Sequence, residues 1–342
     1  MLPTAAAVRP MRSVAVVVAI VAVCSPACER SAAREAVDTV IAAPAPGIVQ
    51  WERMTADAGY PPGYNFPVHV APDGRFIALR TEGTWYSRDG IRWTRGALRP
   101  SGLNSAYLKY VQHEGATWAL GTLQGNYERF SVEPLIHRTA TYEAWELVGR
   151  APTLPQIVFY AAVSFRGAIW LLGGYDRQRQ ETAEIWQSND GVTWRRVVAR
   201  APWSPRAGAS AIVFRDRLYL IGGGRIDGPQ ANDVWSSADG IAWERETDRI
   251  TADGSTGSPV VFGDRLWMIG ANRAGEFASA VLVSDDGRRW DPLSAPWSPR
   301  GGVAVWVHGG DLFMTGGKYS TVRNGETVFE YLSDVWRMRS TP

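Results

Sequence analysis

The sequence has 342 residues, of which 45% are hydrophobic and 20% charged, a composition typical of a folded rather than a disordered chain. Two of its 36 basic residues, Arg9 and Arg12, lie among the first 28 residues, so the rest of the chain carries no net charge against its 34 acidic residues. No run of Lys and Arg interrupts it, which excludes nucleic acid as an expected partner and also a polybasic membrane patch.

Residues 1–27 have the layout of a secretory signal peptide. A positive segment precedes an apolar run over residues 13–23, which is too short to span a bilayer as a stable helix. Cys28 after Ala27 resembles the cleavage box of bacterial lipoproteins, a resemblance that implies lipidation at Cys28, although the two residues before Ala27 depart from the usual pattern. We therefore expect an exported protein, lipid-anchored in the bacterial cell envelope. Modification of Cys24, plain secretion and an uncleaved anchor are the alternatives.

Residues 28–47 are rich in Ala and Pro and are expected to form a tether, followed by one folded domain over residues 48–342. No cysteine occurs after Cys28, so a thiol nucleophile, a disulfide and a Cys-ligated metal are excluded in that domain. The four histidines show no metal-ligand spacing. We expect neither a metal nor a cofactor.

One unit recurs along the folded domain: an alternating apolar strand, a Gly-Gly pair, a loop, a strand with Trp, and the turn Ser-x-Asp-Gly-x-x-Trp. The turn occupies residues 87–93, 188–194, 237–243 and 284–290, and Trp145 follows a degenerate form of it. Asp-Gly is a strong hairpin signal, because Gly adopts positive φ and Asp bonds the turn backbone. The steps between successive turn tryptophans are 52, 49, 49 and 47 residues. Four strands in about 50 residues predict the blades of an all-β propeller.

The last unit, residues 303–339, has a Gly-Gly pair and Trp336 but ends before a second Trp. Near the start of the domain, Trp51 lies in a segment similar to that around Trp243. We therefore expect Trp51 to supply the missing outer strand, so that the N-terminal strand closes the last blade and removes the free sheet edges. This predicts six blades, with seven as the alternative.

Residues 49–338 resemble the kelch family of β-propellers, within the galactose oxidase central-domain-like superfamily. The resemblance rests on the period and on the strand 218–221 with its Gly222-Gly223 pair, preceded by Pro205 and Arg206. It implies a six-bladed kelch-type β-propeller. Galactose oxidase activity is excluded, because its copper–radical site needs a Cys cross-linked to Tyr, and the mature domain has no such Cys.

The candidate site residues lie in a duplicated segment, Ala-Pro-Trp-Ser-Pro-Arg, and are Trp203, Arg206, Trp297 and Arg300. In kelch proteins this Arg opens the innermost strand and faces the pocket around the central channel, so the resemblance implies a grip on a carboxylate or a sugar. On this alignment the other blades hold Tyr64, Ser105, Ile157 and Gly254 at the same position. The alternative is that these arginines and tryptophans brace neighbouring blades.

Three carboxylates, Glu184, Asp233 and Asp334, each precede a strand Trp by two residues. Their repetition at one position favours a structural task over acid–base catalysis. We expect a monomeric binding or scaffolding module for an envelope protein or a small acidic or carbohydrate ligand, touching the membrane only through its lipid anchor. The alternative is a carbohydrate-active envelope enzyme resembling the kelch-type sialic acid mutarotases.

Overall fold

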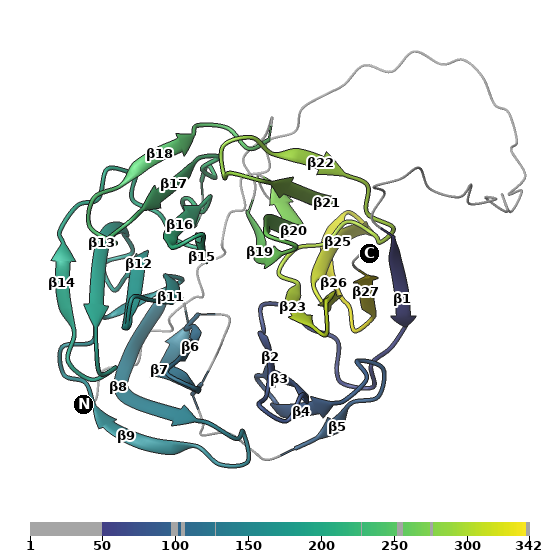
Figure 1. Ribbon diagram of the computed structural model, residues 1–342, viewed down its shortest axis with the longest axis horizontal. Helices are drawn as coiled ribbons and strands as arrows, with labels where there is room; N and C mark the ends of the chain where they lie inside the picture. The colour runs from purple at the N-terminus through teal and green to yellow at the C-terminus, as the bar shows by residue number, and fades with distance from the viewer. Residues whose placement is uncertain are drawn as a thin grey trace, which may run out of the picture. The chain divides into compact units, whose positions relative to one another are not determined.

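Six antiparallel sheets stand around a common axis, each with the strand that follows the preceding blade on the inside of the ring (Figure 1). The computed structural model describes residues 50–96, 102–103, 107–126, 128–226, 228–251, 256–273 and 276–339, and only the backbone of 256, 271–273, 276 and 280. These residues belong to one unit that begins at Gly47. They form strands and turns without a helix, which confirms the predicted six-bladed all-β propeller. None of them lies in a helix long and apolar enough to cross a membrane.

The blades are numbered in chain order. Blade 1 contains β2 (Val68–Val70), β3 (Phe76–Arg80), β4 (Gly83–Ser87) and β5 (Thr94–Arg95). Blade 2 contains β6 (Tyr110–His113), β7 (Ala116–Asn126), β8 (Arg129–Thr139) and β9 (Glu146–Arg150). Blade 3 contains β10 (Ile157–Val158), β11 (Ala161–Phe165), β12 (Ala168–Asp176), β13 (Glu181–Ser188) and β14 (Arg195–Val198).

Blade 4 contains β15 (Ser210–Phe214), β16 (Arg217–Ile221), β17 (Val234–Ser237) and β18 (Glu244–Thr247). Blade 5 contains β19 (Thr256–Phe262), β20 (Arg265–Arg273), β21 (Glu276–Ser284) and β22 (Asp291–Leu293). Blade 6 contains β23 (Ala304–His308), β24 (Asp311–Thr315), β27 (Val335–Arg339) and β1 (Trp51–Thr55). A separate hairpin, β25 (Lys318–Arg323) and β26 (Glu326–Tyr331), is inserted between β24 and β27.

The two ends of the domain share blade 6. Strand β1 pairs antiparallel with β27, with Trp51 opposite Met338 and Arg53 opposite Trp336. Figure 1 shows β1 on the outer edge of this blade, beside the C-terminal strand. The predicted closure by the N-terminal strand is therefore confirmed, and it joins the first and last units into one ring.

The repeated turn is held by its Asp and Ser side chains. In blade 1, one carboxylate oxygen of Asp89 accepts hydrogen bonds from the N–H groups of Ile91 and Arg92, at 2.8 and 2.9 Å. The hydroxyl of Ser87 accepts a hydrogen bond from the N–H of Gly90 at 2.9 Å. The indole of Trp93 donates to the carbonyl of Gly90 at 3.0 Å. The turn of blade 3 repeats the Asp and Trp bonds. There partial burial raises the pKa of Asp190, but the backbone N–H donors outweigh it and lower that pKa to about 2.

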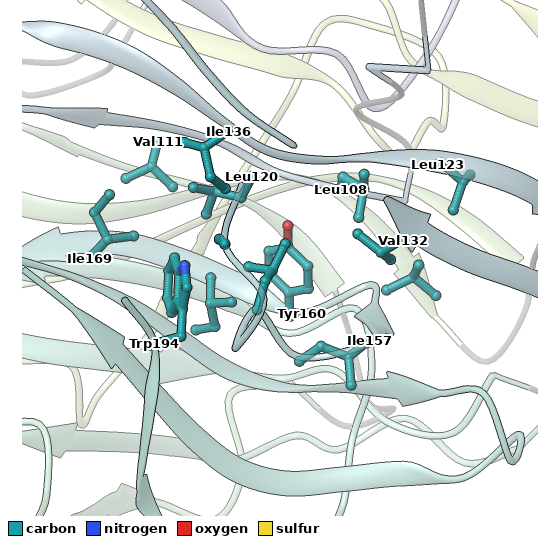
Figure 2. Packing of buried hydrophobic residues seen from close by; sticks show 14 of the residues in the cluster. Leu108, Val111, Leu120, Leu123, Val132, Ile136, Ile157, Tyr160, Ile169 and Trp194 are labelled. Atoms are coloured by element: carbon teal, nitrogen blue, oxygen red, sulfur yellow. The ribbon is translucent and has the colours of Figure 1, made fainter. Parts of the chain in front are cut away.

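The hydrophobic core lies between neighbouring blades. Figure 2 shows one part of it, where Val111, Leu120 and Ile136 of blade 2 lie near Ile169 and Trp194 of blade 3. Each of these side chains is at most 5% exposed. Burial of one such side chain contributes about 2 kcal/mol, so the blades are stabilised chiefly by each other.

Blades 1 and 2 meet through an exchange of large and small residues. In blades 2, 3 and 4 an aromatic residue of the second strand, such as Trp118, lies against a turn glycine of the next blade. A Cβ atom at that glycine, Gly191, would lie 2.6 Å from the Trp118 ring. In blade 1 the strand register puts Ile77 at the aromatic position, and Tyr142 stands at the glycine position of the next turn with φ 64°. Ile77 and Tyr142 share one buried cluster. The aromatic ring at this contact therefore comes from the turn of blade 2 and not from the second strand of blade 1.

Candidate functional site

A set of backbone hydrogen bonds joins the blades where their inner strands begin. The N–H of Phe159 donates to the carbonyl of Tyr107 at 2.8 Å, and the N–H of Gly208 donates to the carbonyl of Phe159 at 2.7 Å. In the same way the N–H of Asn65 donates to the carbonyl of Gly302 at 2.8 Å. We call these five residues the mouth ring. These five residues occupy the same structural position in blades 1, 2, 3, 4 and 6, as their shared hydrogen-bond pattern shows.

Arg206 lies two residues before its mouth-ring glycine and is 1% exposed. Two of its N–H groups donate to the carboxylate of Asp233, at 2.6 and 3.0 Å. The others donate to the carbonyl of Gly222 and to the carbonyl and hydroxyl of Ser204, at 2.9 to 3.0 Å. All five guanidinium donors are thereby used. The contacts leave no N–H group of Arg206 for a ligand.

Arg300 repeats this arrangement in blade 6. It is 2% exposed and donates to Asp334 at 2.5 Å, to the carbonyl of Gly316 at 3.4 Å and to two oxygens of Ser298. Asp334 also accepts the indole N–H of Trp336 at 2.8 Å. The ion pairs tie the start of the inner strand to the start of the third strand of the same blade. These contacts support a bracing role, within one blade rather than between neighbours.

Trp203 and Trp297 lie in the same segments and pack on their own blades. The ring of Trp203 meets that of Trp243 at 4.6 Å and 88°, and the ring of Trp297 meets that of Trp51 at 4.7 Å and 85°. Both side chains are buried, at 3% and 4% exposure. The four predicted site residues therefore form two separate braces, in blades 4 and 6, and we place the ligand site elsewhere.

The position that corresponds to Arg206 in blade 1 is Gly63, so the expected position of Tyr64 is wrong by one residue. The N–H of Gly317 donates to the carbonyl of Gly63 at 2.9 Å, as the N–H of Gly174 donates to the carbonyl of Arg206 at 2.8 Å. Ile157 holds its expected position, two residues before Phe159. Ser105 and Gly254 lie outside the described residues.

Arginine and glycine have exchanged places in blade 1. The strand register makes Arg80, the last residue of β3, the counterpart of Gly222, which follows β16 in blade 4. The carbonyl of Gly222 accepts a hydrogen bond from Arg206. Conversely, Gly63 stands at the Arg206 position, and a Cβ atom there would lie 2.7 Å from Nη2 of Arg80. The glycine leaves room for the guanidinium that enters from the neighbouring strand. In blade 1 the guanidinium therefore comes from the second strand and points toward the start of the inner strand, whereas in blade 4 it comes from the start of the inner strand.

Arg80 is held differently from the two bracing arginines. Its guanidinium lies 4.4 Å from the ring centre of Phe66 and 4.8 Å from that of Tyr60. It donates to the carboxylate of Glu82 and to the carbonyl of Pro61, while Nη1 has no hydrogen-bond partner among the described residues. The side chain is 4% exposed and lines a pocket. Every guanidinium nitrogen of Arg206 and Arg300 donates a hydrogen bond, whereas Nη1 of Arg80 donates none within the described residues, so Arg80 is unlike either brace.

That pocket has a volume of about 340 Å³ and lies on the face of the ring where the inner strands begin. Its walls include Arg80, Glu82 and three tyrosines, Tyr64, Tyr107 and Tyr331. The rings of Tyr64 and Tyr331 are 5.6 Å apart. Burial raises the pKa of the Tyr64 phenol, and the neighbouring phenols of Tyr331 and Tyr107 raise it further, so Tyr64 is a neutral donor at physiological pH. We call this space the tyrosine pocket.

A lysine lies beside the tyrosine pocket. The ammonium of Lys318, the first residue of β25, is 4.2 Å from the ring centre of Tyr64 and 4.4 Å from that of Phe329. Burial lowers the pKa of this ammonium, and no carboxylate pairs with it among the described residues. An ammonium held by aromatic faces without a counter-ion is available to an anion.

A second cavity, of about 320 Å³, lies at the opposite ends of the inner strands. There Nδ1 of His113 is 2.8 Å from the hydroxyl of Ser164, and the phenol of Tyr142 is 2.8 Å from the hydroxyl of Thr117. His113 is the last residue of β6, with its ring 6.0 Å from that of Trp118. This cavity has one carboxylate, Glu114, and no cationic side chain in its wall. An acidic ligand is therefore better matched by the tyrosine pocket.

Sequence reasoning missed the residues of the tyrosine pocket. Tyr64 was named only as the residue aligned with Arg206. The other four residues, Arg80, Tyr107, Tyr331 and Lys318, do not belong to any motif that recurs between the units. The first unit has Arg80-Thr81 where every other unit has at least one glycine, and this was a sign in the sequence that blade 1 differs from the others.

Comparison with known proteins supports the architecture. A family model described as the DUF6242 beta propeller domain matches residues 38–337. A solved structure titled "Structure of YjhT" has a TM-score of 0.61 and 13% identity, and the match covers 80% of this chain and 95% of that chain. A likeness at this identity shows a shared fold alone. No curated protein matches the chain significantly. The family model spans most of the sequence, so the chain belongs to the DUF6242 beta propeller domain family.

Proposed function

We propose that this propeller is a binding module for a small acidic saccharide, which enters the tyrosine pocket. The observation that carries the proposal is one cavity with three tyrosine rings and Arg80 in its wall, together with the ammonium of Lys318 packed on the ring of Tyr64. Small-molecule sites are typically concave and aromatic, with a few polar groups that fix the ligand's orientation. The 340 Å³ pocket lies within the usual range of such sites.

The proposed ligand follows from the chemistry of the wall. An aromatic face carries negative charge density and packs well against the C–H face of a sugar ring, while phenol groups donate and accept hydrogen bonds with its hydroxyls. Lys318 has no carboxylate partner among the described residues, and a sugar carboxylate would supply one. Glu82 already pairs with Arg80, so the nearby carboxylate does not repel the anion as a free charge would.

The test is titration calorimetry of the purified protein with galacturonic acid and with galactose, which differ in the carboxylate. We expect the acid to bind and Lys318→Met to weaken it at least tenfold, about 1.4 kcal/mol. Arg323→Met, in the same hairpin but paired with Glu330, is the matched control and should bind normally. Equal binding of acid and neutral sugar, or unchanged binding by Lys318→Met, would overturn the proposal.

The envelope location is proposed from the leader, whose residues lie outside the described part of the chain. Lipidation of Cys28 would place the propeller on a membrane surface, where a binding module meets exported saccharides. Mass spectrometry of the mature N-terminus tests this directly. We expect a lipid-modified Cys28 as the first residue, and a free Cys28 thiol or cleavage elsewhere would contradict it.

An enzyme that acts on the same sugar acid is the second candidate, because one carboxylate, that of Glu82, does line the pocket. General acid–base work on a sugar needs such a group within reach of the reacting atoms. NMR exchange rates between the two anomers of galacturonic acid separate the candidates. Acceleration that disappears in Glu82→Gln supports the enzyme, whereas no acceleration supports binding alone.

A further inference from the structure

Phe159 has its backbone in the left-handed region, with φ 55°. This conformation is uncommon for residues other than glycine and is an outlier for a bulky one. Three of its four mouth-ring counterparts share this conformation and are suited to it: Gly208 and Gly302 both have φ 66°, and Asn65 has φ 52°. Blade 3 thus has a large aromatic residue where two other blades have glycine.

The backbone of Phe159 is fixed on both sides. Its N–H donates to Tyr107 of blade 2, and its carbonyl accepts from Gly208 of blade 4, so the residue links three blades. A change of φ would break one or both of these bonds. The left-handed conformation is therefore imposed by the ring, and a glycine would satisfy it at lower cost. A strained residue that persists in such a place is a reason to examine its side chain.

The side chain of Phe159 contacts a wall residue of the tyrosine pocket, Tyr107. Its ring centre is 4.9 Å from that of Tyr107, with 39° between the planes, and Tyr107 lines the pocket. Phe159 is partly exposed, in contrast to the fully buried core beneath it. Aromatic residues occur in three successive blades at this end of the inner strands: Tyr64, next to Asn65 of the mouth ring, then Tyr107, then Phe159. The run ends at Gly208, which has no side chain to continue it.

We propose that Tyr107 and Phe159 form a second aromatic platform beside the tyrosine pocket, so that the site binds at least two linked acidic sugar units rather than one. The inference rests on the proposed function and extends it from a monosaccharide to an oligosaccharide. Linked sugar rings present one ring face after another, and an arc of adjacent aromatic rings offers a surface for each. The first unit occupies the tyrosine pocket, and the second lies over Tyr107 and Phe159.

The structure also identifies the competing explanation, in which Phe159 only covers the core cluster between blades 2 and 3. The two explanations differ in what Phe159→Gly should do. A core role predicts a loss of stability with no dependence of binding on ligand length. A platform role predicts a melting temperature near that of the wild type, because relief of the left-handed strain offsets the lost contact, together with a loss that appears only for longer ligands.

The experiment is calorimetric titration of the purified protein with galacturonic acid, its dimer and its trimer. We expect the wild type to bind the dimer at least tenfold more tightly than the monomer, about 1.4 kcal/mol. Phe159→Gly should abolish this gain and leave the monomer affinity unchanged within twofold. Phe159→Asn, which places the residue found at Asn65 of blade 1 in this position, should also abolish the gain in dimer affinity. Phe159→Trp keeps an aromatic ring and should retain that gain.

Glu114→Gly is the matched control. Glu114 also has a left-handed backbone, with φ 48°, but it lies in a turn at the opposite end of the inner strand. It should leave binding of all three ligands unchanged. A dimer gain that survives in Phe159→Gly, or no gain in the wild type, would overturn the second platform while monomer binding still supports the first. Failure of the wild type to bind any of the three would overturn the proposed function itself.

Discussion

The ring of Trp51 meets the ring of Trp297 edge-on, with 4.7 Å between centres and 85° between planes. The pair Trp243 and Trp203 in blade 4 has nearly the same geometry, at 4.6 Å and 88°. Trp51 comes from the first strand of the domain and Trp243 from within the chain, yet each packs on the Trp of the same duplicated segment. The N-terminal strand therefore does in blade 6 what a continuous outer strand does in blade 4.

This equivalence predicts that Trp51→Ala and Trp243→Ala destabilise the domain by similar amounts, about 2–3 kcal/mol each, because both remove a large, partly buried ring from the same kind of contact. Chemical denaturation measures both changes. A much smaller effect of Trp51→Ala would mean that β1 is a loosely attached strand and that the ring closes without it.

The fold could be predicted from the sequence because the blade is a repeat whose chemistry is local. Asp-Gly turns and their tryptophans recur at nearly constant spacing, and Trp51 completes the series. Ile77 and Tyr142 could not be predicted in this way. Each residue departs from the repeat at a different place in the sequence. Their sizes compensate for each other only in the folded protein, where the two side chains from different blades share one cluster.

The second prediction concerns the brace of blade 4. Arg206→Ala should destabilise the protein by about 3 kcal/mol, because it leaves the carboxylate of Asp233 largely buried without its cation. Arg196→Ala is the control. Its partner, Glu184, holds the equivalent place in blade 3, but Arg196 is half exposed, so the expected loss is below about 1 kcal/mol.

Thermal and denaturant unfolding of both variants provides the measurement. If Arg206→Ala unfolded at the wild-type temperature, the buried ion pair would not be a brace, and the arginine would again be a candidate for ligand binding. The pairing had a signal in the sequence: the two blades with the Arg are also the two with Asp, rather than Glu, two residues before the strand Trp.

The third prediction concerns the exchange between Ile77 and Tyr142. Ile77→Trp should be strongly destabilising, because the new ring would meet Tyr142 where other blades have glycine. Tyr142→Gly should also be destabilising, since it empties a buried site. The double variant reproduces the arrangement of Trp118 and Gly191.

A double-mutant cycle measures this coupling. We expect the double variant to be more stable than the sum of the single changes predicts, by at least about 1 kcal/mol. Additive effects would show that the two residues are independent and that the exchange is coincidental.

The fourth prediction is a pH dependence. Burial lowers the pKa of His69 from 6.5 to about 4, and its Nδ1 is bonded to the hydroxyl of Thr117 at 3.0 Å. Between these two pH values the unfolded chain binds a proton that the folded protein does not. The free energy of unfolding should therefore fall as pH is lowered from about 6.5 to about 4.

His69→Asn should flatten this dependence, whereas a change at the exposed His308 should leave it as in the wild type. Melting temperatures measured across this pH window make the comparison. A slope that is the same in His69→Asn and in the wild type would show that His69 titrates normally in the folded protein.

The site was harder to predict than the fold. Alignment brought into view the end of the inner strands at which we propose the ligand site, because Arg206 lies beside the mouth ring. Alignment alone could not show that Asp233 and Asp334 occupy the guanidinium groups, although the two blades with the Arg are also the two with Asp. Nor could it show the reversed guanidinium of Arg80, because an exchange of Arg and Gly between two strands is visible only once the strands are paired.

A crystal structure of the protein with galacturonic acid tests the central claim most directly. We predict ligand density among Tyr64, Tyr107 and Tyr331, with the carboxylate beside Lys318, and with the Arg206–Asp233 and Arg300–Asp334 pairs undisturbed. Density at either bracing arginine, or in the cavity beside His113 on the opposite face, would contradict the account.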